Sequence, residues 1–501
     1  MVWDGRIARG ARVLMVATAL AAAGISCSDG KGGGPGGAGT SGQGGGAGMG
    51  TAGSGGGGAG GATAGRGGTG GSGGDPFAGA IPIVIGGSAT SGTLADPLTS
   101  RDVYSFAGTM GETIQIVTST GAANPFDPTY LDLAITLYDS PILQIAQQAD
   151  PWPRVSNAPT LFTVLPTTGT YYLVVEHCAA VPIGPCVYPG AGLTNRGYTV
   201  SVSDIAGAAF IREGGEPGNG GLAGAAAVTY TKLGGSSYVP LLLHGVLQNA
   251  NDQDTFTFTV PADVPVAPGA RARANFWFQP TREDGNGSSY AVGTIYVVDP
   301  ADTSGTHLVE IDATDYGTGD SPNRPPGNMS FPVQLGKQYA LVVTHSQFSP
   351  EPLRDFYFMQ HLSGAPAGAP LMEIEPNNTQ ATADTLAPIN NQDGTYTFSV
   401  DGDLTTVATD VDFHHLQIPS GPKTLTGECE SQLNGSGVAQ FRLQLLGSDG
   451  TVLLDQTETG GNRTIGTFPI PASGVGVRLS GYLQYSNVTN SSYVCRFVAV
   501  P

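Results

Sequence analysis

A short strand headed by aspartate occurs three times in this 501-residue chain. The copies are Asp102–Phe106, Asp254–Phe258 and Asp412–Leu416, so the aspartates lie 152 and 158 residues apart. In the first copy, the alternation of side chains along a strand places Tyr104 and Phe106 on one face. A glycine-led turn, two alternating apolar runs and a closing strand follow each copy in the same order. The chain therefore contains a repeated unit.

The remaining pattern beyond residue 76 indicates an all-β fold. Apolar and polar residues alternate over short runs bounded by Gly, Pro, Asn and Asp, and long runs with a helical period are missing. Each repeat is long enough to have its own hydrophobic core. We therefore predict three tandem antiparallel β-sandwich (jelly-roll-like) domains, at residues 80–206, 211–365 and 371–501.

The opening of the third repeat carries a family resemblance. It reads Glu373-Ile-Glu-Pro-Asn-Asn-Thr379, the second repeat has only the reduced form Glu216-Pro-Gly-Asn219, and the first lacks the motif. The repeats resemble bacterial pre-peptidase C-terminal domains, which are β-sandwich modules often appended to secreted proteases. They are also distantly similar to the collagen-binding domains of clostridial collagenases. The resemblance implies accessory or binding modules and extends over about residues 80–501.

The N-terminus has the pattern of an export signal. Three arginines precede the 11-residue apolar run Val13–Ala23, which fits a secretory signal and is too short to span a bilayer. The run ends in Gly24-Ile-Ser-Cys27, which resembles the lipobox of bacterial lipoproteins. The resemblance implies a signal peptide at residues 1–26 and a lipid anchor on Cys27. The alternative is an ordinary signal peptide with an incidental cysteine.

A glycine-rich segment follows the cysteine. Residues 30–74 contain 27 Gly in 45 positions and almost no large apolar side chains. Such a segment buries too little surface to offset the entropy lost on ordering, so we expect a disordered linker at residues 27–79. An anchored cysteine followed by a flexible stalk predicts an exported protein held by lipid at the outer membrane or cell surface. A secreted protein is the alternative.

The charge balance limits the partners. The formal net charge is −19, and residues 76–501 carry 16 basic and 37 acidic residues. Because nucleic-acid affinity depends on Lys and Arg that neutralise phosphates, this balance excludes nucleic acid as an expected partner. It suits solubility and cation binding.

Four cysteines remain once Cys27 is assigned to the lipid. Export permits disulfides, and proximity in the sequence suggests the pairs Cys178–Cys186 and Cys429–Cys495. The first pair brackets a loop with proline and glycine, and the second joins two predicted strands 66 residues apart. Neither pair has the spacing of a zinc site.

Catalytic motifs are missing from the sequence. It contains no HExxH, GxSxG or phosphate-binding GxxxxGK[ST] pattern, and its seven histidines are scattered. We therefore expect no enzyme activity, although a glycosidase-like pair of carboxylates is not excluded by sequence. The favoured hypothesis is a surface-anchored protein that binds a matrix, polysaccharide or protein ligand. A structural spacer or secretion-assisting stalk without ligand is the alternative. Trp152, between two prolines, is the candidate ligand contact, with core packing as its alternative.

The third repeat also suggests a calcium site. An alternating run of acids and amides precedes the sandwich, and two aspartates lie at the head of the repeated strand. Calcium takes six to eight oxygen ligands, which carboxylates and amides supply. The spacing of the opening run resembles the calcium-binding linker of the collagen-binding relatives. The alternative is that Asp412 caps a turn while the glutamates are solvated. The candidate ligands are Glu373, Glu375, Asn377, Asn378, Asp410 and Asp412.

Overall fold

The structure is a computed structural model. It describes residues 76–501 except residues 124–126, 140–142, 150–156, 182–185, 187–192, 206, 208, 216–217, 235–236, 280–291, 313–327, 346–355, 366–368, 392–393, 405–406, 408, 432–435, 460–461 and 485–487. Among the described residues the regular elements are strands and short 3-10 turns, such as Cys178–Ala180 and Gln380–Thr382, and none is an α-helix. The predicted all-β class is therefore confirmed.

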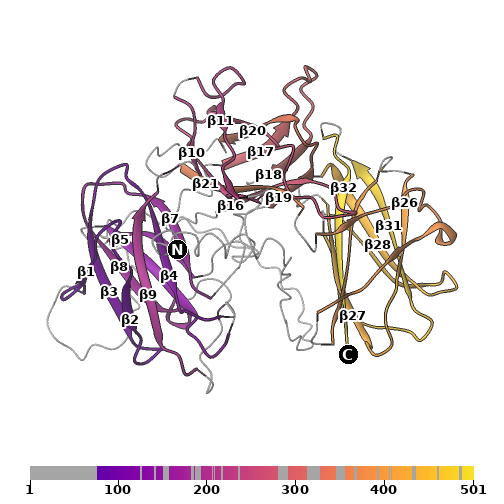
Figure 1. Cartoon of the computed structure of the whole chain (residues 1–501), viewed down its shortest axis with the longest axis horizontal. Coiled ribbons are helices and arrows are strands. Elements are labelled where there is room, and N and C mark those ends of the chain that lie inside the picture. Colours follow the sequence, from indigo (N-terminus) through magenta and orange to yellow (C-terminus); the bar gives the residue numbers. More distant parts are fainter. Residues whose placement is uncertain are drawn as a thin grey trace, which may run out of the picture.

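The strands fall into three successive stretches of chain, which Figure 1 shows in indigo to magenta, magenta to orange, and orange to yellow. We call them the first stretch (residues 76–205), the second stretch (residues 209–365) and the third stretch (residues 369–501). The first stretch forms two sheets. One has the order β1 (Ile81–Pro82), β3 (Arg101–Gly108), β8 (Gly169–His177), β5 (Leu133–Asp139) and β6 (Leu143–Gln148); the other has β2 (Thr90–Thr93), β9 (Gly197–Asp204), β4 (Thr113–Ser119) and β7 (Thr160–Val164).

The second stretch repeats this order and adds a strand to one sheet. One sheet has β11 (Ala226–Val228), β15 (Gln253–Thr259), β20 (Gln338–His345), β17 (Val292–Val298) and β18 (Val309–Asp312). The other has β10 (Phe210–Arg212), β14 (Leu241–Val246), β21 (Phe356–Gly364), β16 (Arg273–Gln279) and β19 (Asn328–Pro332). A small hairpin joins β12 (Lys232–Gly234) to β13 (Ser237–Tyr238).

The third stretch has the order of the second. One sheet has β23 (Asp384–Leu386), β26 (Val411–Leu416), β31 (Val475–Gln484), β28 (Val438–Leu446) and β29 (Val452–Thr459). The other has β22 (Leu371–Met372), β25 (Tyr396–Asp403), β32 (Ser492–Val500), β27 (Thr424–Glu430) and β30 (Asn462–Pro469), with β24 (Ile389–Asn390) beside β25.

The sheets are not purely antiparallel, which corrects the sequence prediction. Five short edge strands run parallel to their neighbours: β1 beside β3, β10 beside β14, β11 beside β15, β22 beside β25, and β23 beside β26. Each lies in the connecting segment before its partner strand, and the longer strands pair antiparallel. Because the entering chain lies along the sheet edge, it covers backbone groups that would otherwise be exposed.

Each stretch buries its own apolar core between its two sheets. In the first stretch Tyr104 of one sheet and Val200 of the other belong to one buried cluster. In the second stretch Phe256 of one sheet and Phe276 of the other belong to one buried cluster. In the third stretch Leu443 belongs to a buried cluster of apolar side chains from both sheets. The predicted alternation is confirmed at the repeated strand, since Tyr104, Phe256 and the equivalent His414 are all buried.

Both predicted disulfides are present. Cys178 pairs with Cys186 across eight residues, and Cys429 pairs with Cys495 across 66. Cys429 and Cys495 lie directly opposite each other on β27 and β32, so this bond joins neighbouring strands of one sheet. In the part of the chain that the structure describes, no helix has the length and apolar character needed to cross a membrane.

Candidate metal centre

The acidic opening segment of the third stretch is fixed along the edge of its sheet. After β22, the Glu373 amide donates to the Asp401 carbonyl (3.1 Å), which continues the parallel pairing with β25. The Ile374 amide donates to Asp384 Oδ2 (2.6 Å). These bonds hold the Glu373 side chain toward the sandwich, while that of Ile374 is 73% exposed. The backbone therefore places an acid, not the neighbouring isoleucine, at the start of β26.

Three predicted calcium ligands meet there. Glu373, Glu375 and Asp412 each offer a carboxylate oxygen, and these oxygens all lie within 4.8 Å of one another. Asp412 is fully buried, whereas Glu373 is half-buried and Glu375 is exposed. Residues separated by almost 40 positions thus form one carboxylate cluster whose deepest member is shielded from water.

Glu373 is held by three donors. The Asp403 amide donates to Oε1 (2.5 Å), while the Tyr493 hydroxyl (2.8 Å) and the Asn377 side-chain amide (3.2 Å) donate to Oε2. Glu375 Oε2 accepts from the Asn377 backbone amide (2.9 Å). The two glutamates are therefore fixed by neutral donors, which leave their negative charge uncompensated.

Asp412 and Asn377 contribute buried oxygens with no partner. Neither carboxylate oxygen of Asp412, nor Asn377 Oδ1, has a hydrogen-bond partner among the described residues, and both side chains are 0% exposed. A buried, unpaired carboxylate is costly, so such a group normally has a cation or a donor beside it. Its chemistry fits the hard oxygen ligands that calcium requires.

Like charges and burial shift the acids in the same direction. Burial raises the pKa of Asp412 to about 9, with further increases from the charges of Glu373, Asp410 and Glu375, and only the Tyr493 hydroxyl opposes them. Burial likewise raises the pKa of Glu373 to about 7, although its hydrogen bonds lower it. All the charged groups that act on Asp412 are negative, which is the electrostatic condition of a cation site.

The other two predicted ligands pair with each other. Oriented so that its nitrogen faces Asp410, the Asn378 side chain donates to Asp410 Oδ1 (2.7 Å) and to the Val411 carbonyl (3.1 Å). Asp410 is buried at the head of β26. Asn378 thus fixes the segment between Asn377 and β26, and Asp410 adds negative charge beside the three-carboxylate cluster.

A tyrosine on the last strand of each stretch faces a glycine across the sheet. Gly92 pairs with Tyr198, Gly245 with Tyr357, and Gly402 with Tyr493. A Cβ on any of the three glycines would collide with the tyrosine ring or its hydroxyl. Because the glycine admits the ring, the hydroxyl lies toward the aspartate at the head of the repeated strand, and it donates to that aspartate in the first and second stretches. We call this arrangement the Asp–Tyr–Gly junction; its members are Asp102, Tyr198 and Gly92; Asp254, Tyr357 and Gly245; and Asp412, Tyr493 and Gly402.

The junction of the second stretch is satisfied by neutral donors. Asp254 Oδ1 accepts from the Asn219 side-chain amide (2.8 Å), and its Oδ2 accepts from the Tyr357 hydroxyl (2.9 Å). Asn219 also donates to Glu213 Oε2 (3.3 Å). Glu213 and Asn219 occupy the positions of Glu373 and Asn377, since their backbones make the same bonds to the neighbouring strands. Both carboxylate oxygens of Asp254 therefore accept a hydrogen bond.

In the first stretch a second tyrosine, Tyr104, contacts the tyrosine of the junction. The Tyr198 hydroxyl donates to Asp102 Oδ2 (2.6 Å) and lies 2.8 Å from the Tyr104 hydroxyl. His414 occupies the position of Tyr104 in the third stretch, and its Nε2 lies 2.9 Å from the Tyr493 hydroxyl. His414 is therefore a buried, hydrogen-bonded side chain.

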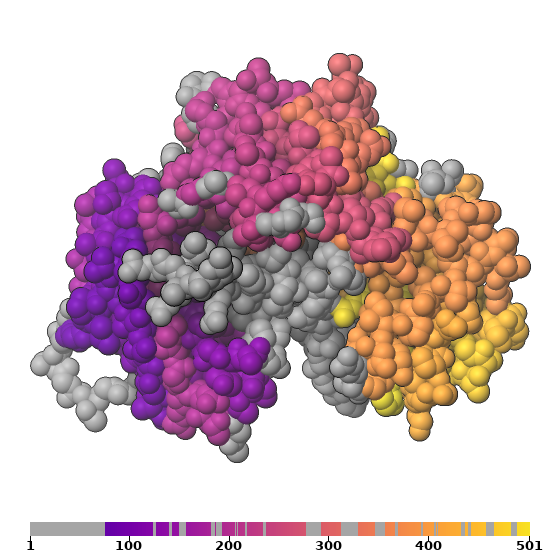
Figure 2. Space-filling view, in the orientation of Figure 1, coloured from indigo at the N-terminus to yellow at the C-terminus, as the bar shows by residue number. Residues whose placement is uncertain are grey.

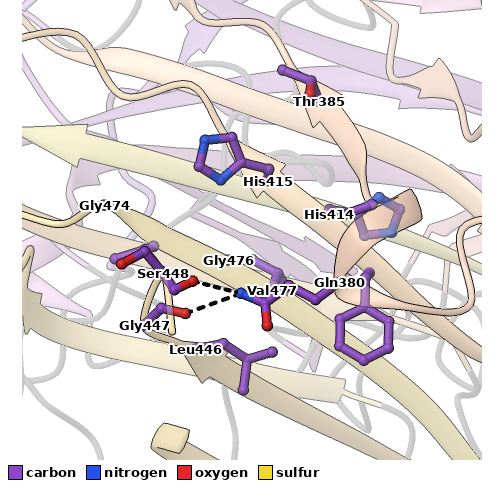
Figure 3. A pocket seen from close by; sticks show the side chains of 13 residues that line it. Gln380, Thr385, His414, His415, Leu446, Gly447, Ser448, Gly474, Gly476 and Val477 are labelled. Atoms are coloured by element: carbon purple, nitrogen blue, oxygen red, sulfur yellow. Dashed lines mark hydrogen bonds between the residues drawn. The ribbon is translucent and has the colours of Figure 1, made fainter. Parts of the chain in front are cut away.

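Several other candidates fall elsewhere. Cys27 and Trp152 lie outside the described residues. The His177, Cys178 and Cys186 side chains also approach one another, but the two sulfurs form a disulfide and cannot bind metal as thiolates. A pocket of about 280 Å³ lies beside β26, where Gln380 donates to the Ser448 carbonyl (3.1 Å; Figure 3).

Sequence reasoning missed Tyr493 and Gly402. Tyr493 belongs to the site because its hydroxyl donates to Glu373. Gly402 belongs to it because a side chain there would collide with the Tyr493 ring and with the Glu373 carboxylate. The signal was available for the tyrosine, since Tyr198, Tyr357 and Tyr493 stand near the start of the three closing strands. The facing glycines depend on strand register, which the spacing of the repeats did not reveal.

Comparisons with known proteins add little. No protein-family model and no curated protein matches the chain. Among solved structures it is similar to the pre-peptidase C-terminal domain of a collagenase from Bacillus anthracis (18% identity, TM-score 0.18, covering 25% of this chain and 93% of that one). It is also similar to tandem CBM51 modules of a family 98 glycoside hydrolase from Streptococcus pneumoniae (9% identity, TM-score 0.16, covering 55% and 83%). TM-scores this low carry no argument about function.

Proposed function

We propose that the chain is an exported, non-catalytic protein of three successive β-sandwich domains, and that the third binds calcium. The observation that carries the proposal is the convergence of Glu373, Glu375 and Asp412 beside buried oxygens of Asp412 and Asn377 that accept no hydrogen bond from the described residues. Calcium would take carboxylate oxygens from these three acids and the Asn377 side-chain oxygen. It would neutralise the cluster and hold the opening segment against the sandwich.

The cluster does not suit glycoside hydrolysis. Catalytic carboxylates in glycosidases stand about 5–5.5 Å or about 6.5–9.5 Å apart, with a sugar or water between them. Here oxygens of all three acids lie within 4.8 Å, and Asp412 is fully buried beneath the segment that carries the glutamates. A substrate would have to displace that segment, so the geometry favours an ion over a sugar.

Export and anchoring complete the proposal. The two disulfides suit an oxidising compartment. With the lipobox-like Cys27 and the glycine-rich linker, they favour a lipid anchor that holds the modules at the outer membrane or cell surface. The modules would bind a matrix, polysaccharide or protein ligand, with a ligand-free spacer as the alternative. Palmitate labelling of the wild type and of Cys27→Ala tests the anchor, because unchanged labelling in the variant would exclude it.

Thermal unfolding of the full chain tests the calcium site. Calcium at 100 times its dissociation constant should stabilise the third domain by about 2.7 kcal/mol. Asp412→Asn should abolish this shift, whereas Asp102→Asn, the same change in the junction of the first stretch, should retain it. Equal unfolding midpoints of the wild type in millimolar calcium and in chelator would refute the site.

A further inference from the structure

Two arginines of the second stretch reach the strand beside the cation site. Arg271 forms ion pairs with Asp401 and Asp403 and donates to the Gly402 carbonyl (3.0 Å). Arg273 Nη1 donates to Asp401 Oδ1 (2.6 Å). Arg273 is itself held in place, since Nε donates to Ser330 Oγ (2.9 Å) and Nη2 to the Ser330 carbonyl (2.7 Å). The Arg273 guanidinium is therefore fixed within the second stretch, and both guanidiniums pair with carboxylates of the third.

The two ion pairs with Asp401 are buried, whereas Asp403 is 35% exposed. The side chains of Asp401, Arg273 and Arg271 are 2%, 9% and 15% exposed. Figure 2 shows the magenta and red atoms of the second stretch lying directly against the orange and yellow atoms of the third. Removing one partner of a buried pair leaves an uncompensated charge, which is strongly destabilising. We call this set of ion pairs the arginine joint.

Backbone contacts reinforce the arginine joint on both sides of the site. The Met372 amide, next to Glu373, donates to the Gly269 carbonyl (2.8 Å). The segment just before β32 pairs with the second stretch as well, where Thr489 donates to the His307 carbonyl (2.9 Å) and Asn490 to the Leu308 carbonyl (3.0 Å). Two of the three strands of the third junction, β25 with Gly402 and β32 with Tyr493, are thus contacted at or next to their ends by the preceding stretch.

One three-residue segment of β25 serves the arginine joint and the cation site together. The side chains of Asp401 and Asp403 face the arginines, while Gly402 faces Tyr493. The backbone of the same segment holds Glu373 through the Asp401 carbonyl (3.1 Å) and the Asp403 amide (2.5 Å). Any shift of this segment would move a cation ligand and the arginine joint at once.

We propose that cation binding at Glu373, Glu375 and Asp412 and closure of the arginine joint favour each other, so that calcium locks the second and third stretches into one body. This inference rests on the proposed calcium site. The six carboxylates of the proposed cation ligands and the arginine joint outnumber the two guanidiniums of the joint, so a divalent cation reduces the excess of negative charge. The carboxylates are Glu373, Glu375, Asp401, Asp403, Asp410 and Asp412.

Linkage gives the first test. If calcium favours the closed arginine joint, then opening the joint must lower calcium affinity by the same factor. Calorimetric titration of the full chain should show at least about a fivefold loss of affinity in Arg271→Gln/Arg273→Gln, the lower end of typical couplings. Charge alone predicts the opposite, because losing two positive groups near the site would tighten a cation.

Two further variants keep this test decisive. Arg442→Gln removes an arginine of the third stretch that pairs with Asp455 on the surface, and it should leave the affinity unchanged. Arg271→Gln alone retains the ion pair between Arg273 and Asp401. It therefore disturbs the fold less than the double variant and should show a smaller loss of calcium affinity. It replaces the double variant in the titration if that variant fails to fold. Equal or tighter calcium binding by the arginine variants would overturn the linkage and leave the calcium site intact.

The second readout is the distance between the stretches. In a Cys27→Ala background, spin labels at the exposed residues Ser304 and Ser448 should give a narrow distance distribution with calcium and a broad one with chelator. The arginine variants should be broad in both conditions. If the wild type binds calcium but its distance distribution is the same with calcium and with chelator, the linkage is wrong. If the wild type binds no calcium, both the calcium site and the linkage are wrong.

Discussion

The first and third stretches build the same junction around different chemistry. In both, a tyrosine passes over a facing glycine toward the aspartate that heads the repeated strand. In the first stretch Tyr198 donates to Asp102 (2.6 Å), and the aspartate is satisfied. In the third, Tyr493 donates to Glu373 (2.8 Å), and neither buried oxygen of Asp412 has a hydrogen-bond partner among the described residues.

This difference comes from the segment that enters the sandwich. The described part of the first stretch begins with β1, whereas the second and third begin with an additional edge strand, β10 or β22, followed by a glutamate and an asparagine. The second stretch is intermediate, because the amide of Asn219 satisfies its aspartate. The paired sheets thus supply a tyrosine and an aspartate in every stretch, and the entering segment sets which groups surround the aspartate.

Removing the disulfides should produce the largest difference in stability between the first and third stretches. In the chain-entropy model, the 66-residue loop of Cys429–Cys495 contributes about 4 kcal/mol and the eight-residue loop of Cys178–Cys186 about 2.5 kcal/mol. Replacing each pair by alanine and measuring chemical unfolding should therefore destabilise the third stretch more than the first. Loss of Cys429 and Cys495 also leaves a buried cavity, which increases the difference. An equal or larger loss at the first pair would contradict the model.

The sequence predicted the periodic features and missed those set by register. The all-β class, the repeated strands, both disulfides and the approach of Glu373 and Glu375 to Asp412 followed from alternation, spacing and the family resemblance. Parallel edge strands were not predicted, because pairings of two or three residues carry no periodic signal. Arg271 and Arg273 were also missed, since contacts between residues about 130 positions apart depend on how the second and third stretches pack on each other.

Glycine substitutions test the shared part of the junction. A methyl group at Gly92 or Gly402 would press on the facing tyrosine ring, so each alanine variant should lose about 1–3 kcal/mol of stability, as overpacked sites do. Gly402→Ala should also weaken calcium binding, and Gly92→Ala should not. Gly466→Ala, which meets open space in β30, serves as the control. Equal calcium affinity in Gly402→Ala and the wild type would show that the site does not depend on the junction.

The smallest expected effect is a pH dependence confined to the metal-free third stretch. The folded-state pKa of Asp412 is raised to about 9 by burial and by its acidic neighbours, far above the ordinary value of 3.8. Between these values the folded chain holds a proton that the unfolded chain releases. The free energy of unfolding in chelator should therefore fall as pH rises, until pH passes the folded-state pKa.

Urea unfolding in chelator at pH 8 and 9 measures this effect. One such group changes stability by at most about 1.4 kcal/mol per pH unit, so we expect a loss of about 1 kcal/mol over the interval. Asp412→Asn should remove the loss, because asparagine does not titrate, while Asp102→Asn should retain it. Saturating calcium should also remove it, because the cation stabilises the ionised carboxylate that the proton otherwise neutralises. If the wild type loses as much stability in calcium as in chelator, the charge on Asp412 is not what separates the third junction from the first.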